Sequence, residues 1–212
     1  MSVICFDLDG TLSDPKLGIT RSIQHALREL GRPVPTADDL TSCIGPPLLG
    51  SFKKLLGSSK EAENALRLYR ERFGETGIYE NELYPGIAAA LSGLKSSGRR
   101  MFVATSKPKV FADRIIVHFG LSPYFEAIYG SELDGTRSDK SELLAWVVAQ
   151  ERLSPAKAVM VGDRSHDIAG GRENGMATLG VLYGYGTRTE LLEAGADDLC
   201  QSPIDLTLHL CG

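Results

Sequence analysis

The sequence predicts an α/β protein whose core is a Rossmann-like parallel sheet, with an α-helical cap domain inserted into it. Short apolar runs recur after residue 98 without polar alternation, which is typical of strands buried on both faces. Helical patterns separate these runs, as in a parallel sheet covered by helices. One further apolar run opens the chain, and a long segment with only helical patterns, residues 16–81, follows it.

The first expected strand is the run VICF at residues 3–6. The segment behind it contains amphipathic stretches in which apolar residues recur at helical spacing. These stretches span residues 16–31, 46–57 and 59–74. We therefore expect a core formed by residues 1–14 and 82–212, and a small helical cap formed by residues 15–81.

From residue 84 onwards the chain alternates between helices and strands. The further strands are expected at residues 99–106, 124–132, 156–163 and 177–184. The helices are expected at residues 84–98, 107–120, 139–153 and 166–175, and the alternation continues less clearly over residues 187–210. Since ligands of an open parallel sheet bind beyond the carboxyl ends of its strands, the residues that follow these strands are the candidates for a site.

The composition indicates a soluble globular protein. Of the 212 residues, 42% are hydrophobic and 24% are charged, which fits one core with a modest insertion. A net charge of −4 does not favour a nucleic-acid polymer or an anionic membrane as partner. Aspartates near the N-terminus and the lack of a long apolar run argue against a signal peptide or a membrane span. The four cysteines are not regularly spaced, which favours reduced thiols and a cytoplasmic protein. We expect a monomer or a homodimer.

Chemically active side chains follow the expected strands. Aspartates follow the first strand, a hydroxyl pair and a lysine follow the second, a lysine opens the helix after the third, and aspartates follow the fourth. In chain order they are Asp7, Asp9, Thr105, Ser106, Lys107, Lys140, Asp163 and Asp167. Carboxylates, hydroxyls and ammonium groups at one sheet edge are suited to holding a hard divalent cation against a phosphate.

Asp7 and Asp9 are separated by one residue, and carboxylates this close repel each other unless a cation or a proton neutralises part of their charge. Mg²⁺ prefers oxygen ligands and often bridges carboxylates to a substrate phosphate, so Asp7 and Asp163 become ligands rather than repelling neighbours. The Leu8 spacer directs Asp9 away from Asp7 and leaves it free for proton transfer. Gly10 allows a tight turn and offers its N–H to an anion.

Four motifs in order carry a resemblance to a known family. They are DLDGT at residues 7–11, TS at 105–106, a later lysine, and GDRSHD at 162–167. This order resembles the haloacid dehalogenase (HAD) superfamily of hydrolases. A helical insertion directly after the first motif resembles members with a small C1-type cap. The stretches GITRSIQHAL and IGPPLLGSF are similar to the subgroup that contains phosphoglycolate phosphatases and certain 5′-nucleotidases.

The resemblance implies catalytic roles for the first two motifs. Asp7 would attack the phosphorus and form an aspartyl-phosphate. Asp9 would protonate the leaving alkoxide and then activate the water that hydrolyses the intermediate. Thr105, with the N–H groups around Gly10 and Ser106, would hold the phosphoryl oxygens. Ser106 stands where close relatives often carry asparagine, which puts the contacts to the leaving group in doubt.

The resemblance also implies a Mg²⁺ site. Asp7, Asp163 and the backbone carbonyl of Asp9 would bind the ion. Asp167 would bind the ion directly, or it would contact a group that binds the ion. Since aspartate also caps helices, a purely structural role for Asp167 is the alternative.

Lysine and arginine candidates complete the predicted site. Lys140 is the favoured lysine for offsetting the charge of the nucleophile and the phosphoryl group, and Lys107 is open as its substitute or assistant, or as a solvated side chain. In the cap, Arg21 is a candidate for a substrate anion, with a solvated helix charge as the alternative. Gly45, in the loop TSCIGPP, is the best candidate for substrate specificity.

We expect a Mg²⁺-dependent phosphatase that acts on a small soluble phosphate monoester, with phosphoglycolate or a nucleoside 5′-monophosphate favoured. A phosphomutase, which returns the phosphoryl group to a sugar phosphate, is one alternative. A non-catalytic, receiver-like phosphate-binding protein is another, although receiver domains usually lack an inserted helical segment. A dehalogenase is disfavoured because that chemistry needs no metal.

Overall fold

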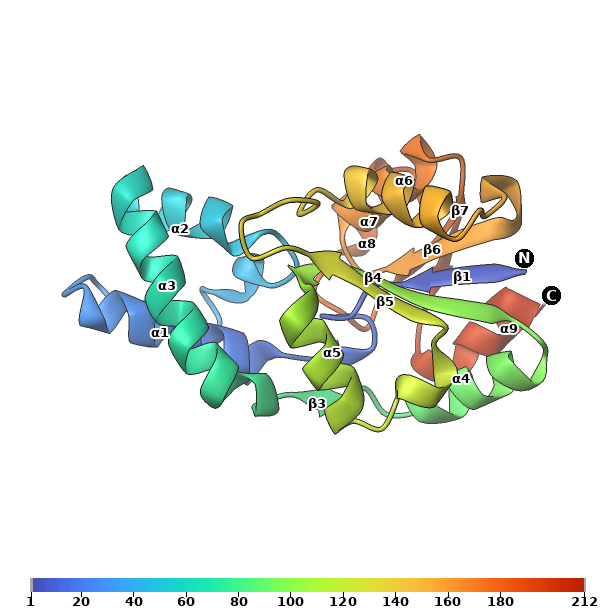
Figure 1. Ribbon diagram of the computed structural model, residues 1–212, viewed down its shortest axis with the longest axis horizontal. Helices are drawn as coiled ribbons and strands as arrows, with labels where there is room; N and C mark the ends of the chain where they lie inside the picture. The colour runs from blue at the N-terminus through green and yellow to red at the C-terminus, as the bar shows by residue number, and fades with distance from the viewer. Residues whose placement is uncertain (1, 212) are drawn as a thin grey trace. The chain divides into compact units, whose positions relative to one another are not determined.

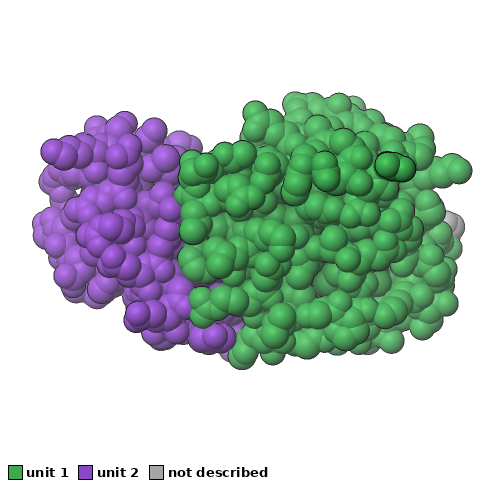
Figure 2. Space-filling model, viewed as in Figure 1, with its two compact units in different colours: residues 1–14, 83–212 green, residues 15–82 purple. Residues whose placement is uncertain are grey.

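The computed structural model describes residues 2–211. The chain divides into two compact units, coloured separately in Figure 2. Unit 1 comprises residues 1–14 and 83–212, and unit 2 comprises residues 15–82. The short strands β2 (Ser13–Asp14) and β3 (Glu82–Leu83) form a two-stranded sheet of their own.

Unit 1 contains a six-stranded sheet with the order β5-β4-β1-β6-β7-β8. Its strands are β1 (Val3–Phe6), β4 (Arg100–Pro108), β5 (Ala127–Ser131), β6 (Ala158–Gly162), β7 (Ala177–Val181) and β8 (Asp198–Cys200). Every neighbouring pair is parallel, which confirms the predicted α/β core. The first strand lies between β4 and β6, where the strand order reverses, and this is the place where such sheets bind ligands.

Helices cover both faces of this sheet. They are α4 (Ile87–Ser96), α5 (Lys109–His118), α6 (Lys140–Gln150), α7 (Ser165–Glu173), α8 (Arg188–Glu193) and α9 (Leu206–Cys211). Figure 1 shows α6 and α7 on one face and α4, α5 and α9 on the other. The least clear part of the predicted pattern, residues 187–210, forms α8, β8 and most of α9.

Alternate residues of the strands build the core beneath α6. Val3 and Cys5 of β1 belong to one buried cluster with residues of β4, β6 and α6. The other members are Phe102, Ala104, Leu143, Leu144, Val147, Leu153, Ala158, Met160 and Met176. Each fully buried aliphatic side chain such as Leu144 contributes about 1.5–3 kcal/mol relative to an exposed one. This packing fixes α6, and therefore its first residue, against the sheet.

One strand differs from its predicted extent. The strand expected over residues 99–106 runs on to Pro108, with a register shift against β5 between Thr105 and Pro108. Gly130 of β5 permits the irregularity, because a Cβ there would lie 2.6 Å from the carbonyl oxygen of Lys107. The helix that follows starts at Lys109 instead of Lys107.

Unit 2 is helical, as its apolar periodicity predicts. Its helices are α1 (Lys16–Glu29), α2 (Leu48–Leu56) and α3 (Ser59–Glu75), with short 3₁₀ turns at Thr41–Cys43 and Gly77–Tyr79. The side chain of Ser58 caps α3 by accepting the N–H of Glu61. Phe52, Tyr69 and Phe73 pack their rings together between α2 and α3. Within the described residues, no helix is both long and apolar enough to cross a bilayer.

Candidate active site

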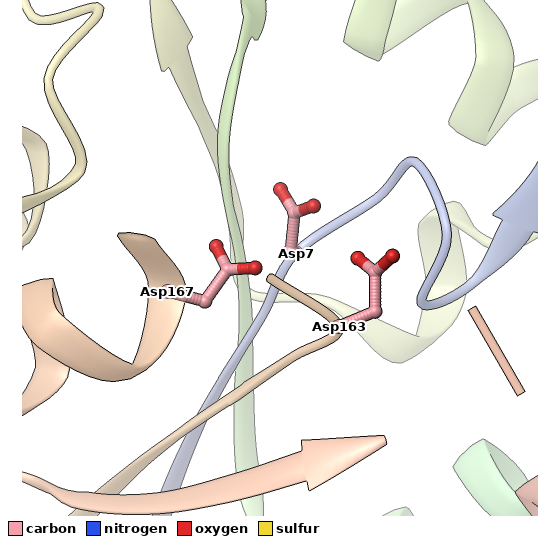
Figure 3. Close-up of side chains that lie close together, drawn as sticks. All are labelled: Asp7, Asp163 and Asp167. Atoms are coloured by element: carbon pink, nitrogen blue, oxygen red, sulfur yellow. The ribbon is translucent and has the colours of Figure 1, made fainter. Parts of the chain in front are cut away.

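Three buried aspartates converge at the carboxyl edge of the sheet. Asp7 directly follows β1, Asp163 directly follows β6, and Asp167 lies in the first turn of α7. One carboxylate oxygen from each lies within 4.8 Å of the other two. Figure 3 shows the three side chains around a common space. The structure therefore brings together acids that are separated in the sequence by up to 160 positions.

Lys140 lies beside this cluster. Its Nζ is 2.9 Å from Oδ1 of Asp7 and 2.8 Å from Oδ1 of Asp167, and it donates to the carbonyl of Ala104 at 2.8 Å. Its side chain is 1% exposed, so solvent does not screen these interactions. As the first residue of α6, held by the Asp139 N-cap, it points inward from a fixed backbone.

The electrostatics of the cluster are unbalanced. Burial, followed by the charges of Asp167 and Asp7, raises the pKa of Asp163 well above its ordinary value. Burial also raises the pKa of Asp7, and Lys140 offsets this only in part. For Asp167, burial is the largest single effect and acts upward, but Lys140, His166 and the N–H of Arg164 together outweigh it, and the pKa is lowered. Lys140 itself is disfavoured as a cation by burial, yet the two carboxylates raise its pKa above the usual range.

Asp9 has a different environment from Asp7. Its carboxylate is 2.6 Å from Nζ of Lys107, and the two side chains are only 9% and 6% exposed. Its other oxygen, Oδ1, is buried and has no hydrogen-bond partner among the described residues. The carboxylate of Asp9 is thus outside the Asp7–Asp163–Asp167 cluster and has an unused acceptor.

The hydroxyl pair lies at the irregular end of β4. Thr105 and Ser106 are both buried, and Oγ1 of Thr105 accepts the N–H of Lys107 at 3.3 Å. The Ser106 hydroxyl is buried without a partner in the described part of the chain. Since buried polar groups are normally hydrogen-bonded, this hydroxyl and Asp9 Oδ1 are the atoms that a ligand would satisfy.

Gly10 lies in a tight turn. Its N–H donates to the carbonyl of Ser13 at 2.8 Å, and a contact of this group with an anion stays a prediction. Its φ of +84° and its closeness to Asp163 explain the glycine. A Cβ on Gly10 would lie 2.2 Å from Oδ2 of Asp163.

Asp167 caps a helix and also belongs to the acidic cluster. Its Oδ2 accepts the N–H of Arg164 at 3.1 Å, which is a cap of α7. Its Oδ1 forms the ion pair with Lys140. The cap contact and the position in the acidic cluster therefore coexist in one side chain.

The cap candidates lie in unit 2. Arg21 donates to Oε1 of Glu80 at 2.8 Å, so its guanidinium is engaged within that unit. Gly45 has a φ of +99° after the turn Thr41–Cys43. A contact of either residue with a substrate stays a prediction.

One part of the site was not predicted from the sequence. The main-chain N–H of Tyr185 donates to Oδ2 of Asp163 at 2.7 Å. Tyr185 belongs to the segment YGYG that follows β7, the strand next to β6. Alternating glycines directly after a strand at the same sheet edge were the available signal.

Known proteins are similar to this chain in sequence and fold. The family model described as haloacid dehalogenase-like hydrolase matches residues 4–181. A 5′-nucleotidase of Pseudomonas aeruginosa is 49% identical over 189 residues, covering 89% of this chain and 86% of that protein. The tyrosine-protein kinase PtkA of Mycobacterium tuberculosis is 43% identical over 184 residues, which cover 87% of this chain but only 63% of PtkA. The crystal structure of a predicted phosphatase from Clostridium acetobutylicum superposes with a TM-score of 0.96 at 38% identity, covering 99% of this chain and 98% of that one.

Proposed function

The chain belongs to the haloacid dehalogenase-like hydrolase family, and we propose that it is a Mg²⁺-dependent phosphatase that hydrolyses a small phosphate monoester through an aspartyl-phosphate at Asp7. The observation that carries the proposal is the convergence of Asp7, Asp163 and Asp167 beside Lys140. Structural ion pairs alone do not explain this arrangement, because Lys140 pairs with Asp7 and Asp167 while the buried Asp163 has no ion pair with it.

The acidic cluster fits a divalent cation. Three ionised carboxylates and Lys140 leave a charge near −2, which burial makes unfavourable unless a cation is bound. The three carboxylate oxygens lie within 4.8 Å of one another, so one ion that takes oxygen ligands at about 2.0–2.1 Å could be shared among them. Asp7 and Asp163 would hold the ion, and Asp167, whose oxygens already serve Lys140 and Arg164, would contact it through water. When bound, the ion neutralises phosphoryl charge during transfer.

The proposed chemistry has two steps. Asp7 attacks the phosphorus, the ester P–O bond breaks, and Asp9 gives a proton to the leaving oxygen. A water then attacks the phosphorus of the aspartyl-phosphate while Asp9 takes its proton, and inorganic phosphate and free Asp7 result. The unpartnered Oδ1 of Asp9 supports this role, since it is a buried oxygen that the described part of the chain leaves free for a ligand.

The two lysines have separate roles in this proposal. Lys140 offsets the charge of Asp7 and of the phosphoryl group attached to it. Lys107 orients Asp9 through their ion pair. Ser106 and Thr105 would hold phosphoryl oxygens, with the unpartnered hydroxyl of Ser106 as the supporting observation.

For the substrate, a nucleoside 5′-monophosphate is favoured by the 49% identity to a protein named 5′-nucleotidase. Phosphoglycolate is the second candidate, from the sequence resemblance. We also propose that unit 2 acts as a cap that excludes bulk water, and that Arg21 and Gly45 of this unit contribute to substrate specificity. The proposed location of the protein is the cytoplasm, and its proposed oligomeric state is a monomer or a homodimer.

A second candidate function is transfer of the phosphoryl group to a tyrosine hydroxyl. The 43% identity to a protein named tyrosine-protein kinase favours it. The first step would be the same, and a tyrosine oxygen would replace water in the second. A hydrolase releases one inorganic phosphate per substrate consumed, whereas a transferase or a mutase releases less and leaves the phosphoryl group on its acceptor.

A substrate panel tests the proposal. Nucleoside 5′-monophosphates, phosphoglycolate and sugar phosphates are incubated with Mg²⁺ or with EDTA, and substrate loss and phosphate release are both measured. We expect stoichiometric release with Mg²⁺ and none with EDTA. The variant Asp7→Asn should be inactive with an unchanged melting temperature, and the exposed Asp113→Asn in α5 should match the wild type. Full activity of Asp7→Asn would refute the proposed nucleophile.

A further inference from the structure

The loop after β7, Tyr183–Gly186, lies against Asp163. The N–H of Tyr185 donates to Oδ2 of Asp163 at 2.7 Å, and Oγ1 of Thr11 donates to Oδ1 at 3.4 Å. Asp163 is 0% exposed. Its carboxylate is therefore held from two sides by groups of the protein, and each oxygen keeps a lone pair for another partner.

Two glycines make this approach possible. A Cβ on Gly184 would lie 2.3 Å from the carbonyl oxygen of Gly10 and 2.4 Å from Cβ of Asp163. A Cβ on Gly186 would lie 1.8 Å from the carbonyl oxygen of Asp163. Neither glycine has a positive φ, so close contact with Asp163 is the reason that only glycine fits at these positions.

The same loop is anchored to the segment that carries the first motif. The Tyr183 hydroxyl donates to the carbonyl of Thr11 at 3.1 Å, and the Tyr185 hydroxyl donates to the carboxylate of Asp14. The ring of Tyr84 packs edge-on against Tyr183 at 5.1 Å. Burial, followed by the hydrogen bond to Asp14, raises the pKa of Tyr185, so its phenol stays protonated as a donor.

We propose that the loop Tyr183–Gly186 is a positioning element that presets the Asp163 carboxylate for the divalent cation. This inference rests on the proposed function, because it assigns Asp163 to the metal. A carboxylate already fixed in one orientation loses less side-chain freedom when it binds an ion. Groups that orient a metal ligand in this way typically change the affinity for the metal about 10- to 100-fold when they are removed.

The test measures metal binding without turnover. Mn²⁺, which takes the same oxygen ligands as Mg²⁺, is titrated into the full-length protein and the free ion is counted by electron paramagnetic resonance. Gly184→Ala should raise the Kd at least tenfold, and Gly186→Ala should do the same. Gly50→Ala is the matched control, because Gly50 is exposed in α2 and an added Cβ there meets nothing within 4 Å. Its Kd should equal that of the wild type.

A second measurement covers the case in which both glycine variants fail to fold. In the ¹⁵N-labelled wild type, the Tyr185 amide resonance should shift during a Mg²⁺ titration, with the same Kd as the bulk binding. An unchanged Kd in a folded Gly184→Ala, or a Tyr185 resonance that does not move while Mg²⁺ binds, overturns the positioning role and leaves the proposed function intact. A wild-type protein that binds neither ion overturns both.

Discussion

Nζ of Lys140 lies 2.9 Å from Oδ1 of Asp7, although 133 positions separate the two residues in the chain. Both side chains are almost fully buried, at 1% and 4% exposure. A buried ion pair that left no other acid nearby would be structural, but Asp167 shares the same ammonium. Lys140 therefore compensates part of the charge of a cluster with excess negative charge.

Lys140→Met keeps the length of the side chain and removes its charge. We expect kcat to fall by about 10²–10³, the typical loss when one preorganised electrostatic contact to the reacting group is removed. KM should change little, since the lysine acts on the transferring group. Steady-state kinetics on the best substrate of the panel measure both constants.

The control for this variant is Lys157→Met, an exposed lysine in the 3₁₀ turn Pro155–Lys157 directly before β6, which should keep the wild-type kcat. A wild-type kcat for Lys140→Met would contradict its assignment and return Lys107 to the role considered for it in the sequence analysis.

Lys107→Met tests the ion pair with Asp9. If Lys107 orients the acid that protonates the leaving group, its loss should slow the hydrolysis of an alkyl phosphate at least tenfold more than that of p-nitrophenyl phosphate, whose leaving group needs no proton. Parallel assays with the two esters measure the ratio. Equal slowing of both would show that Lys107 does not act through proton transfer.

Metal binding should stabilise the folded protein. A ligand present at 100 times its Kd stabilises by about 2.7 kcal/mol, so saturating Mg²⁺ should raise the melting temperature by several degrees and EDTA should reverse the rise. In Asp163→Asn the rise should be largely lost, because one of the charged ligands is gone. Differential scanning calorimetry of both proteins gives the comparison. The same rise in the variant would exclude Asp163 from the metal site.

The partly buried carboxylate of Glu80 in unit 2 should make the stability of the protein depend on pH. Hydrogen bonds from Arg72 and then Arg21 lower the pKa of Glu80, whose side chain is 18% exposed. A lowered pKa stabilises the protein above the unfolded value of about 4.3, and this stability disappears as the pH falls through the folded pKa. Glu80→Gln should therefore lower the free energy of unfolding by about 1–3 kcal/mol at pH 7.

The difference between Glu80→Gln and the wild type should shrink as the pH is lowered below about 4 in urea titrations. The exposed Glu63→Gln of α3 should change the free energy by less than about 0.5 kcal/mol at either pH. A difference for Glu80→Gln that is independent of pH would show that packing, and not charge, is lost.

The sequence patterns predicted the buried strands of the core and the acids that follow them. Unalternating apolar runs such as residues 3–6 indicate buried parallel strands, and strands ending in Asp7 and Asp163 place these acids at one edge. The pairing of Lys107 with Asp9 was out of reach, because it depends on the register shift between Thr105 and Pro108. The engagement of the Gly10 N–H by Ser13 is likewise a property of the folded turn.

The Tyr185 contact shows the same limit. Its main-chain N–H binds Asp163, and a main-chain donor has no residue-type signal. Only the flanking glycines Gly184 and Gly186 indicate this contact, since their lack of a side chain allows the loop backbone to lie close to Asp163. Sequence patterns therefore located the acids but not the groups that hold them in place.

Acid-quench trapping of the phosphorylated protein tests the central claim most directly. Asp9→Asn should leave Asp7 able to attack while slowing hydrolysis of the intermediate. The variant is mixed with Mg²⁺ and an aryl phosphate, whose leaving group needs no proton, and is quenched with acid within one turnover. Mass spectrometric sequencing should then find one phosphoryl group on Asp7. A phosphoryl group on another residue, or rapid phosphate release with none on Asp7 at any quench time, would contradict the account.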